Sequence, residues 1–200
     1  MGMDYFNARA AELRTFLESR LAADGEEFSF LKPWGQDLPA RLLAFARGGK
    51  LIRGGLVFLG QELAGGEPGQ EALIVGAAME LLQSGFLIHD DIMDRDRLRR
   101  GMPAVFWQYR EAASARGLAD AYHYGESMGI CAGDCAFFLA FRLLLSAGLP
   151  PGLAAYCCRE VYAVGLAQMQ DVDFGAFPDI PREADITTLY TWKTGRYSFS

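Results

Sequence analysis

Apolar residues recur at helical spacing along most of this chain, and breaks in that pattern divide it into segments. The stretch 4–21 carries one apolar stripe among Arg and Glu residues, which predicts an amphipathic helix. Two shorter helices are predicted within 38–66, because Gly48–Gly49 interrupts the pattern and Gly65–Gly66 ends it. The next segment, 71–94, is apolar on nearly all faces until its last turn, as expected of a helix buried at the centre of a domain.

Three more helices are predicted in the second half of the chain, at 119–148, 152–175 and 184–200, each bounded by Gly or Pro or by the end of the sequence. We find no convincing alternation of a β-strand, so the expected fold class is all-α, a single-domain helical bundle. Because the helical pattern is still running at Ser200, we expect residues 1–200 to be the N-terminal part of a domain that is truncated here.

The composition narrows the classes of function. Hydrophobic residues make up 51% of the chain, enough for one sizeable core, and a net charge of -6 argues against a nucleic-acid binder. We see no leader pattern and no apolar run of about 18 residues that would span a bilayer, so we expect a cytoplasmic protein. The cysteines are interpreted as buried free thiols: Cys131, Cys135, Cys157 and Cys158.

Three carboxylates crowd the end of segment 71–94, namely Asp90, Asp91 and Asp94. Asp90 and Asp94 are one helical turn apart, and Asp91 lies about 100° round from Asp90. Like charges at this spacing need cations among them, and oxygen-only ligands favour Mg²⁺, which usually also binds substrate phosphates. The alternative is a solvated acidic helix end.

Two basic pairs complement the carboxylates. Arg99 and Arg100 follow them, and guanidinium groups suit phosphate oxygens, although simple salt bridges to the aspartates would also explain the pair. Lys50 and Arg53 lie three residues apart after two glycines, which would let an anion approach the backbone. Together the pairs indicate a ligand with phosphate groups.

The helical stripe that leads back from Asp90 is apolar, with Phe86 and Leu87 after Gln83 and with Gly85 beside them. A ligand held by its phosphates at Asp90 would lie with its other end against this wall, which describes a prenyl diphosphate better than a nucleotide. Ordinary core packing of Phe86 and Leu87 is the alternative.

These residues and motifs make the chain resemble the trans-prenyl diphosphate synthases, the family of farnesyl and geranylgeranyl diphosphate synthases. Its first aspartate-rich motif, DDxxD, is met by Asp90, Asp91 and Asp94 with Arg99-Arg100-Gly101 after it, and its glycine-lysine-arginine motif by Gly49, Lys50 and Arg53. Later motifs are similar to Gly133-Asp134, to the pair Gln168 and Asp171, and to Lys193, Thr194 and Tyr197.

Departures from the family pattern are local, apart from one absence. Leu51 stands where an Arg is common, Gly54 where a Pro is usual, and Phe106 where many members have a His or another residue that faces the site. The second aspartate-rich motif should follow Ser200.

The resemblance implies an isoprenoid synthase fold, a homodimer and Mg²⁺ held by Asp90, Asp91 and Asp94. It implies that Arg99 and Lys193 offset the charge on a departing allylic diphosphate. Isopentenyl diphosphate would bind through Lys50, Arg53 and Arg100. Further roles in binding substrate fall to Gln83, Gln168, Asp171, Thr194 and Tyr197.

Product length should depend on what blocks the apolar stripe one turn, about 5.4 Å, below Asp90. Phe86 is bulky there and Gly85 is not, so the resemblance favours geranylgeranyl over farnesyl diphosphate. Two alternatives stay open, a noncatalytic prenyl-synthase-like subunit and an inactive truncated fragment, whereas a terpene cyclase is disfavoured. A cyclase would not need Lys50, Arg53 and Arg100 for a second diphosphate.

Overall fold

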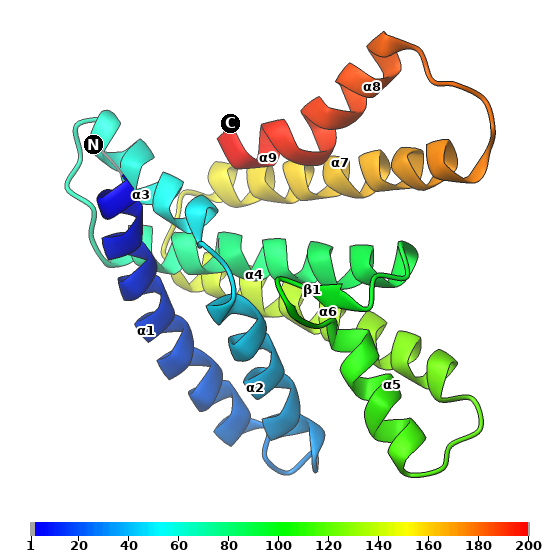
Figure 1. The fold of residues 1–200 in the computed structure, drawn as a ribbon. Helices are drawn as coiled ribbons and strands as arrows, with labels where there is room; N and C mark the ends of the chain where they lie inside the picture. The colour runs from blue at the N-terminus through cyan, green and yellow to red at the C-terminus, as the bar shows by residue number, and fades with distance from the viewer. Residues whose placement is uncertain (1–2, 200) are drawn as a thin grey trace. The chain divides into compact units, whose positions relative to one another are not determined.

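The computed structural model describes residues 3–199 and consists mainly of helices (Figure 1). The chain forms two units, one ending at Ala147 and one beginning at Gly148. The helices of the first unit are α1 (Met3–Glu27), α2 (Trp34–Arg47), α3 (Ile52–Leu63), α4 (Gln70–Met93), α5 (Val105–Ala115) and α6 (Ala121–Ser146). The second unit contains α7 (Pro151–Ala176), α8 (Glu183–Tyr190), the π-helix η1 (Thr191–Gly195) and α9 (Arg196–Phe199).

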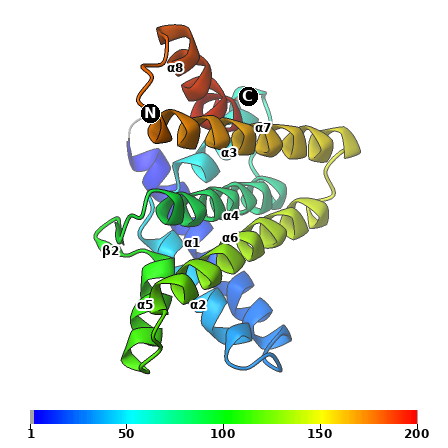
Figure 2. The ribbon, with the colours of Figure 1, turned by 90° about the vertical axis from the view of Figure 1, so that its right-hand side faces the viewer.

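The core of the first unit lies around α4, which runs beside α6 in both Figure 1 and Figure 2. Helices α1, α2, α3 and α5 all contact α4, so this helix is the one on which the unit is built. Apolar residues from α1, α2, α4, α5 and α6 form the central cluster: Leu21, Leu42, Ile88, Val105, Tyr109, Ala132 and Ala136. The prediction of a central buried helix is confirmed.

Helices α3 and α4 meet backbone to backbone. A Cβ atom on Gly54 would lie 3.0 Å from the carbonyl oxygen of Gly76, and one on Gly76 would lie 3.1 Å from that of Gly54. At these distances a side chain at either position would force the facing backbone to shift. The pair of glycines therefore sets how closely α3 approaches α4.

A polar network joins α2 to α5. Arg41 binds the Asp37 carboxylate through Nε at 2.8 Å and Nη2 at 2.9 Å, and it donates to Gln108 Oε1 at 2.7 Å. The buried Tyr109 hydroxyl donates to the same carboxylate at 2.9 Å, and the Arg41 guanidinium lies 4.3 Å from the ring centroid. Buried polar groups are thus satisfied across two helices.

Two elements were missed from the sequence. One is an antiparallel hairpin of β1 (Leu98–Arg99) and β2 (Met102–Pro103), whose strands are too short to show alternation. The other is α5, although its buried residues Val105, Phe106, Tyr109 and Ala113 do follow a helical period. Phe106 is completely buried in this core.

Two expectations about composition need correction. Cys131, Cys135 and Cys158 are exposed and Cys157 is half-buried, so the thiols are free as predicted but are not core residues. The second expectation was that no apolar run could span a bilayer. Within residues 3–199, two helices, α4 and α6, are long and apolar enough to do so by length and composition. Most of the apolar window in α4 is buried in the protein, as in the core helix of a helical bundle.

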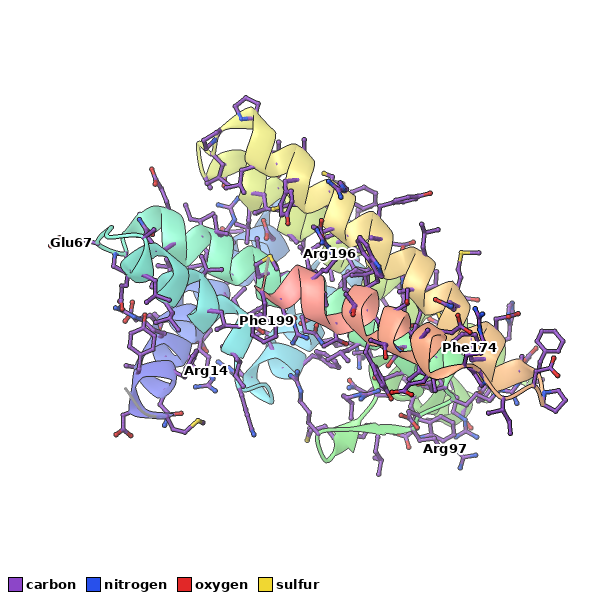
Figure 3. The ribbon with its side chains drawn as sticks, turned by 90° about the horizontal axis from the view of Figure 1, so that it is seen from above. Arg14, Glu67, Arg97, Phe174, Arg196 and Phe199 are labelled. Carbon is purple, nitrogen blue, oxygen red and sulfur yellow. The ribbon has the colours of Figure 1, made fainter. Side chains whose placement is uncertain are left out.

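The second unit is a helical hairpin in which α8, η1 and α9 return along α7 (Figure 1). Arg196, labelled in Figure 3, makes two hydrogen bonds of 2.9 Å to the buried Glu160 carboxylate, from Nε and Nη2. The sequence predicted one continuous helix over 184–200, but a π-helical turn at Thr191–Gly195 interrupts it.

Candidate active site

The carboxylates at the end of α4 divide into two groups. Asp90 and Asp94 lie one turn apart, Asp90 with a side chain 18% exposed and Asp94 exposed to solvent. Asp91 is on another side of the helix and its side chain is completely buried. The three carboxylates therefore do not present a common face.

Arg99 explains the burial of Asp91. Its Nε donates to Asp91 Oδ1 at 2.6 Å, and its Nη2 pairs with the same oxygen. The second Asp91 oxygen is buried without a hydrogen-bond partner among residues 3–199. Burial raises the pKa of the Asp91 carboxyl to about 6, an effect that the Arg99 guanidinium opposes.

Asp90 and Asp94 are the two carboxylates of this cluster that are accessible to a hard cation. Within the described part of the chain, no three His, Cys, Asp or Glu side chains are grouped so as to hold a metal ion. Mg²⁺ commonly takes one or two protein carboxylates and completes its shell with water and substrate phosphates, so two aspartates suffice. Asp91 binds Arg99 in this structure, and its predicted role as a metal ligand stays a prediction.

The two arginines of the β1–β2 hairpin contact different parts of the first unit. Arg99 turns to the aspartates, with Nη2 also 3.9 Å from Asp90 and 3.5 Å from Asp96. Arg100 occupies the turn with φ of 54°, followed by Gly101 with φ of 77°. These left-handed values are those of a tight two-residue hairpin turn, in which Asn-Gly is the favoured pair.

Arg100 packs onto the segment that precedes α3. Its Nη1 donates to the Phe45 carbonyl oxygen at 3.2 Å, and a Cβ on Gly49 would come within 2.5 Å of that nitrogen. Gly49 therefore leaves the space that the guanidinium fills. This contact joins the two basic motifs, which are about fifty residues apart in the sequence.

Lys50 lies in the loop between α2 and α3, and Arg53 follows it at the start of α3. Arg14, labelled in Figure 3, extends from α1 and donates to the Gly49 carbonyl oxygen at 3.0 Å. Lys50 is exposed and Arg53 is half-buried in the first turn of α3. The predicted grouping of the lysine with Arg53 and Arg100 is thus compatible with the structure of the first unit.

The apolar stripe that precedes Asp90 on α4 was expected to be open at Gly85, and in the structure it is not. A Cβ there would lie 2.7 Å from the Phe137 ring of α6 and 3.0 Å from the Gly133 carbonyl oxygen. Phe137 also packs on Phe86, with ring centroids 4.9 Å apart. The space assigned to Gly85 is therefore filled by an aromatic ring from another helix, while Gln83 is buried farther down α4.

The second unit brings together two of its predicted site residues. Lys193 Nζ forms an ion pair with the Asp171 carboxylate, one turn along α7 from Gln168. Lys193 and Thr194 lie in the π-helical turn, a feature often found at functional sites. Thr194 is exposed, and Tyr197 is buried in the first turn of α9.

Two residues near the site were not identified from the sequence. The contact of Phe137 with Gly85 and Phe86 could not be predicted from the sequence, because it depends on how α4 and α6 pack. Glu80 is a carboxylate within the apolar stretch of α4. Its position could have marked it in the sequence, since a buried charge requires partners.

Comparison with known proteins finds one family similar to this chain. A family model described as Polyprenyl synthetase matches residues 40–200. Geranylgeranyl diphosphate synthase from Sulfolobus acidocaldarius is 28% identical, with 96% of this chain and 52% of that protein aligned. Geranylfarnesyl diphosphate synthase from Natronomonas pharaonis is 32% identical, with 90% and 53% aligned.

A solved structure is similar over nearly the whole chain. Geranylgeranyl pyrophosphate synthase from Corynebacterium glutamicum, complexed with isoprenyl diphosphate and magnesium, has a TM-score of 0.84 at 26% identity, covering 99% of this chain and 57% of that one. The chain thus spans about half the length of the relatives it matches. The match over most of its length shows that the chain belongs to the polyprenyl synthetase family.

Proposed function

We propose that this chain carries part of a short-chain trans-prenyl diphosphate synthase, which condenses isopentenyl diphosphate with an allylic diphosphate. The observation that carries the proposal is the β1–β2 hairpin. Its adjacent arginines connect the aspartates of α4 to the glycine-rich segment before α3. One hairpin thereby supports two neighbouring anion sites, which is what a reaction between two diphosphates requires.

The allylic diphosphate would bind at the acidic end of α4. Mg²⁺ at Asp90 and Asp94 would supply positive charge to the departing diphosphate. Arg99, fixed by Asp91, would add a preorganised guanidinium on the same side. The resemblance gives Lys193 the same charge-offsetting role, and it gives Gln168, Asp171, Thr194 and Tyr197 roles in binding the substrate.

Isopentenyl diphosphate would bind to Lys50, Arg53 and Arg100. Ionisation of the allylic carbon–oxygen bond leaves a carbocation, which the double bond of isopentenyl diphosphate attacks. Loss of a proton, taken up by the released diphosphate, restores a double bond and leaves the chain one isoprene unit longer. The apolar side chains of α4 would keep water from the cation.

Geranylgeranyl diphosphate is our first candidate for the product. Its support is the absence of an aromatic side chain at Gly85 and the names of two of the similar proteins. Farnesyl diphosphate is the second candidate, because the Phe137 ring fills the space at Gly85 and packs on Phe86.

We further propose a cytoplasmic homodimer without a membrane-spanning segment. Support for a second copy comes from apolar side chains on one side of α6: Ile130, Phe138 and Leu145 are 49%, 74% and 77% exposed. Exposed apolar groups of this size are typical of protein interfaces. The buried share of α4 supports a core position for that helix.

Product analysis of the full-length protein tests the proposal. The protein is incubated with Mg²⁺, labelled isopentenyl diphosphate and each of dimethylallyl, geranyl and farnesyl diphosphate. We expect elongated diphosphates, their loss on adding EDTA, and a rate reduced by at least about 100-fold in Asp90→Asn. Cyclic products would favour a terpene cyclase, and binding without turnover in the complete chain would favour a noncatalytic subunit.

A further inference from the structure

Glu80 is a buried carboxylate to which the proposed reaction assigns no role. It lies on α4 ten residues before Asp90 and is 5% exposed. A charge at such a position is costly unless hydrogen bonds and opposite charges surround it. Its partners therefore indicate why an acidic residue is placed there.

The first partner is the N-terminus of α3. The Gly54 backbone N–H donates to Glu80 Oε1 at 2.8 Å. Leu51, at the N-cap position, has an aliphatic side chain that cannot accept a hydrogen bond and a left-handed backbone with φ of 50°. Glu80 thus caps α3 from another helix, and its negative charge suits the positive end of the helix dipole.

Gly54 makes this contact possible in two ways. A proline, usual at this position of the family motif, has no N–H to donate. A Cβ at Gly54 would lie 2.5 Å from Leu13 Cδ1 and 3.3 Å from Glu80 Cγ. Gly54, which stands where the motif usually has a proline, therefore supplies the N–H that Glu80 accepts.

The second set of partners is the basic cluster. Arg53 in the first turn of α3 and Arg100 in the hairpin both interact electrostatically with the Glu80 carboxylate. Burial raises the pKa of Glu80, and the Gly54 and Arg53 backbone N–H groups and the two guanidinium charges oppose that rise. Two like charges brought together without a ligand repel one another, and a carboxylate between them offsets that repulsion.

We propose that Glu80 is a positioning residue for the isopentenyl diphosphate site. Its bond to Gly54 fixes the start of α3, and its charge holds Arg53 and Arg100 toward one point. The identity of the ligand rests on the proposed function, whereas the binding of a diphosphate anion by this cluster does not.

The test is diphosphate affinity in the full-length protein, measured by calorimetry with inorganic pyrophosphate and with isopentenyl diphosphate. Mg²⁺ is omitted and EDTA added, so that the aspartates of α4 contribute little. We expect Glu80→Ala to weaken both affinities by about tenfold or more, as for loss of a charged hydrogen-bonding group. Glu80→Gln, which keeps an acceptor for Gly54, should lose about threefold. Glu71→Gln, an exposed change on the same helix, is the matched control.

Comparing the KM values of the two substrates separates a positioning role of Glu80 from a general effect on folding. In active enzyme, Glu80→Gln should raise KM for isopentenyl diphosphate and leave KM for the allylic substrate within about twofold. Gly54→Pro in the Glu80→Ala background should add less than it does alone, because each change removes the hydrogen bond between Gly54 and residue 80.

Unchanged pyrophosphate affinity in folded Glu80→Ala protein overturns the inference, as does an equal rise of both KM values in Glu80→Gln. Pyrophosphate binding that depends on Glu80, in a protein that does not elongate prenyl chains, would refute the proposed function and leave the positioning role intact.

Discussion

At the scale of single residues, Gly85 and Phe137 show that the role inferred for a residue from the sequence can change once its spatial neighbours are known. In the sequence Gly85 is an open position beside Phe86, whereas in the structure the Phe137 ring occupies that opening. Asp91 is a second example, because its buried carboxylate binds Arg99 of the hairpin. Both changes arise from contacts between segments that are separate in the sequence.

Gly85→Ala tests the close approach of α4 and α6. The new Cβ would meet the Phe137 ring and the Gly133 carbonyl oxygen, so we expect a loss of about 1–3 kcal/mol in the free energy of unfolding. Urea denaturation measures the loss, and Phe137→Leu in the same chain should recover part of it. An additive double mutant would show that the ring does not limit this position.

Phe137→Ala tests the control of product length in the full-length enzyme. Removing the ring that packs on Phe86 opens space about one turn below Asp90, so we expect the main product to lengthen by at least one isoprene unit. Chromatography of the dephosphorylated products reads out the length. Phe138→Ala, a 74% exposed neighbour, should leave the length unchanged. An unaltered product from Phe137→Ala would exclude a role for this ring.

At the scale of elements, the attachment of α2 to α5 depends on polar contacts more than on the apolar pattern. Asp37 accepts hydrogen bonds from Arg41 and from the buried Tyr109 hydroxyl. Burial raises the pKa of Asp37, but these hydrogen bonds outweigh it, and the net pKa is lowered. The ionised carboxylate is therefore the form that stabilises the fold.

The lowered pKa of Asp37 predicts a loss of stability in acid. The contribution is fully present above the ordinary carboxyl pKa of about 4 and is lost as the pH falls through the lower folded value. Asp37→Asn should cost about 1–3 kcal/mol at pH 7 and flatten the dependence below pH 4. Urea unfolding from pH 7 to pH 3 measures both effects, with the exposed Glu67→Gln as control. An unchanged acid slope in Asp37→Asn would contradict the assignment.

At the scale of the whole molecule, the exposed apolar residues of α6 are a feature that the packing of residues 3–199 does not explain. Ile130, Phe138 and Leu145 lie within one side of that helix and contribute large apolar surface. A second copy of the chain is the partner that we propose for them.

Sedimentation of the full-length protein tests the dimer. We expect a mass of two chains for the natural sequence, and dissociation in Phe138→Glu, because a buried unpaired charge at an interface is strongly unfavourable. Phe30→Glu changes a side chain of similar exposure, 71%, in the turn between α1 and α2 and should leave the mass unchanged. Two-chain mass in Phe138→Glu would place the interface elsewhere.

Much of the fold was predictable because helical periodicity is local. The pattern of apolar residues indicated α2, α3, α4, α6 and α7 within about four residues of their ends, and it ended α1 six residues too early, at Leu21. The hairpin was not predictable from alternation, since its strands have two residues each, and η1 was not, because a π-helical turn leaves the apolar period almost unchanged.

The sequence by itself determined the helical class, the central helix α4 and the order of the aspartate, arginine and lysine motifs, because these depend on residue type and spacing along one segment. The tertiary structure decided which of these groups meet: Asp91 with Arg99, Arg100 with Gly49, Gly85 with Phe137 and Glu80 with Gly54. Each pair joins side chains or backbone groups of different segments. Such contacts depend on how closely the segments pack, and glycines at the crossings set that distance.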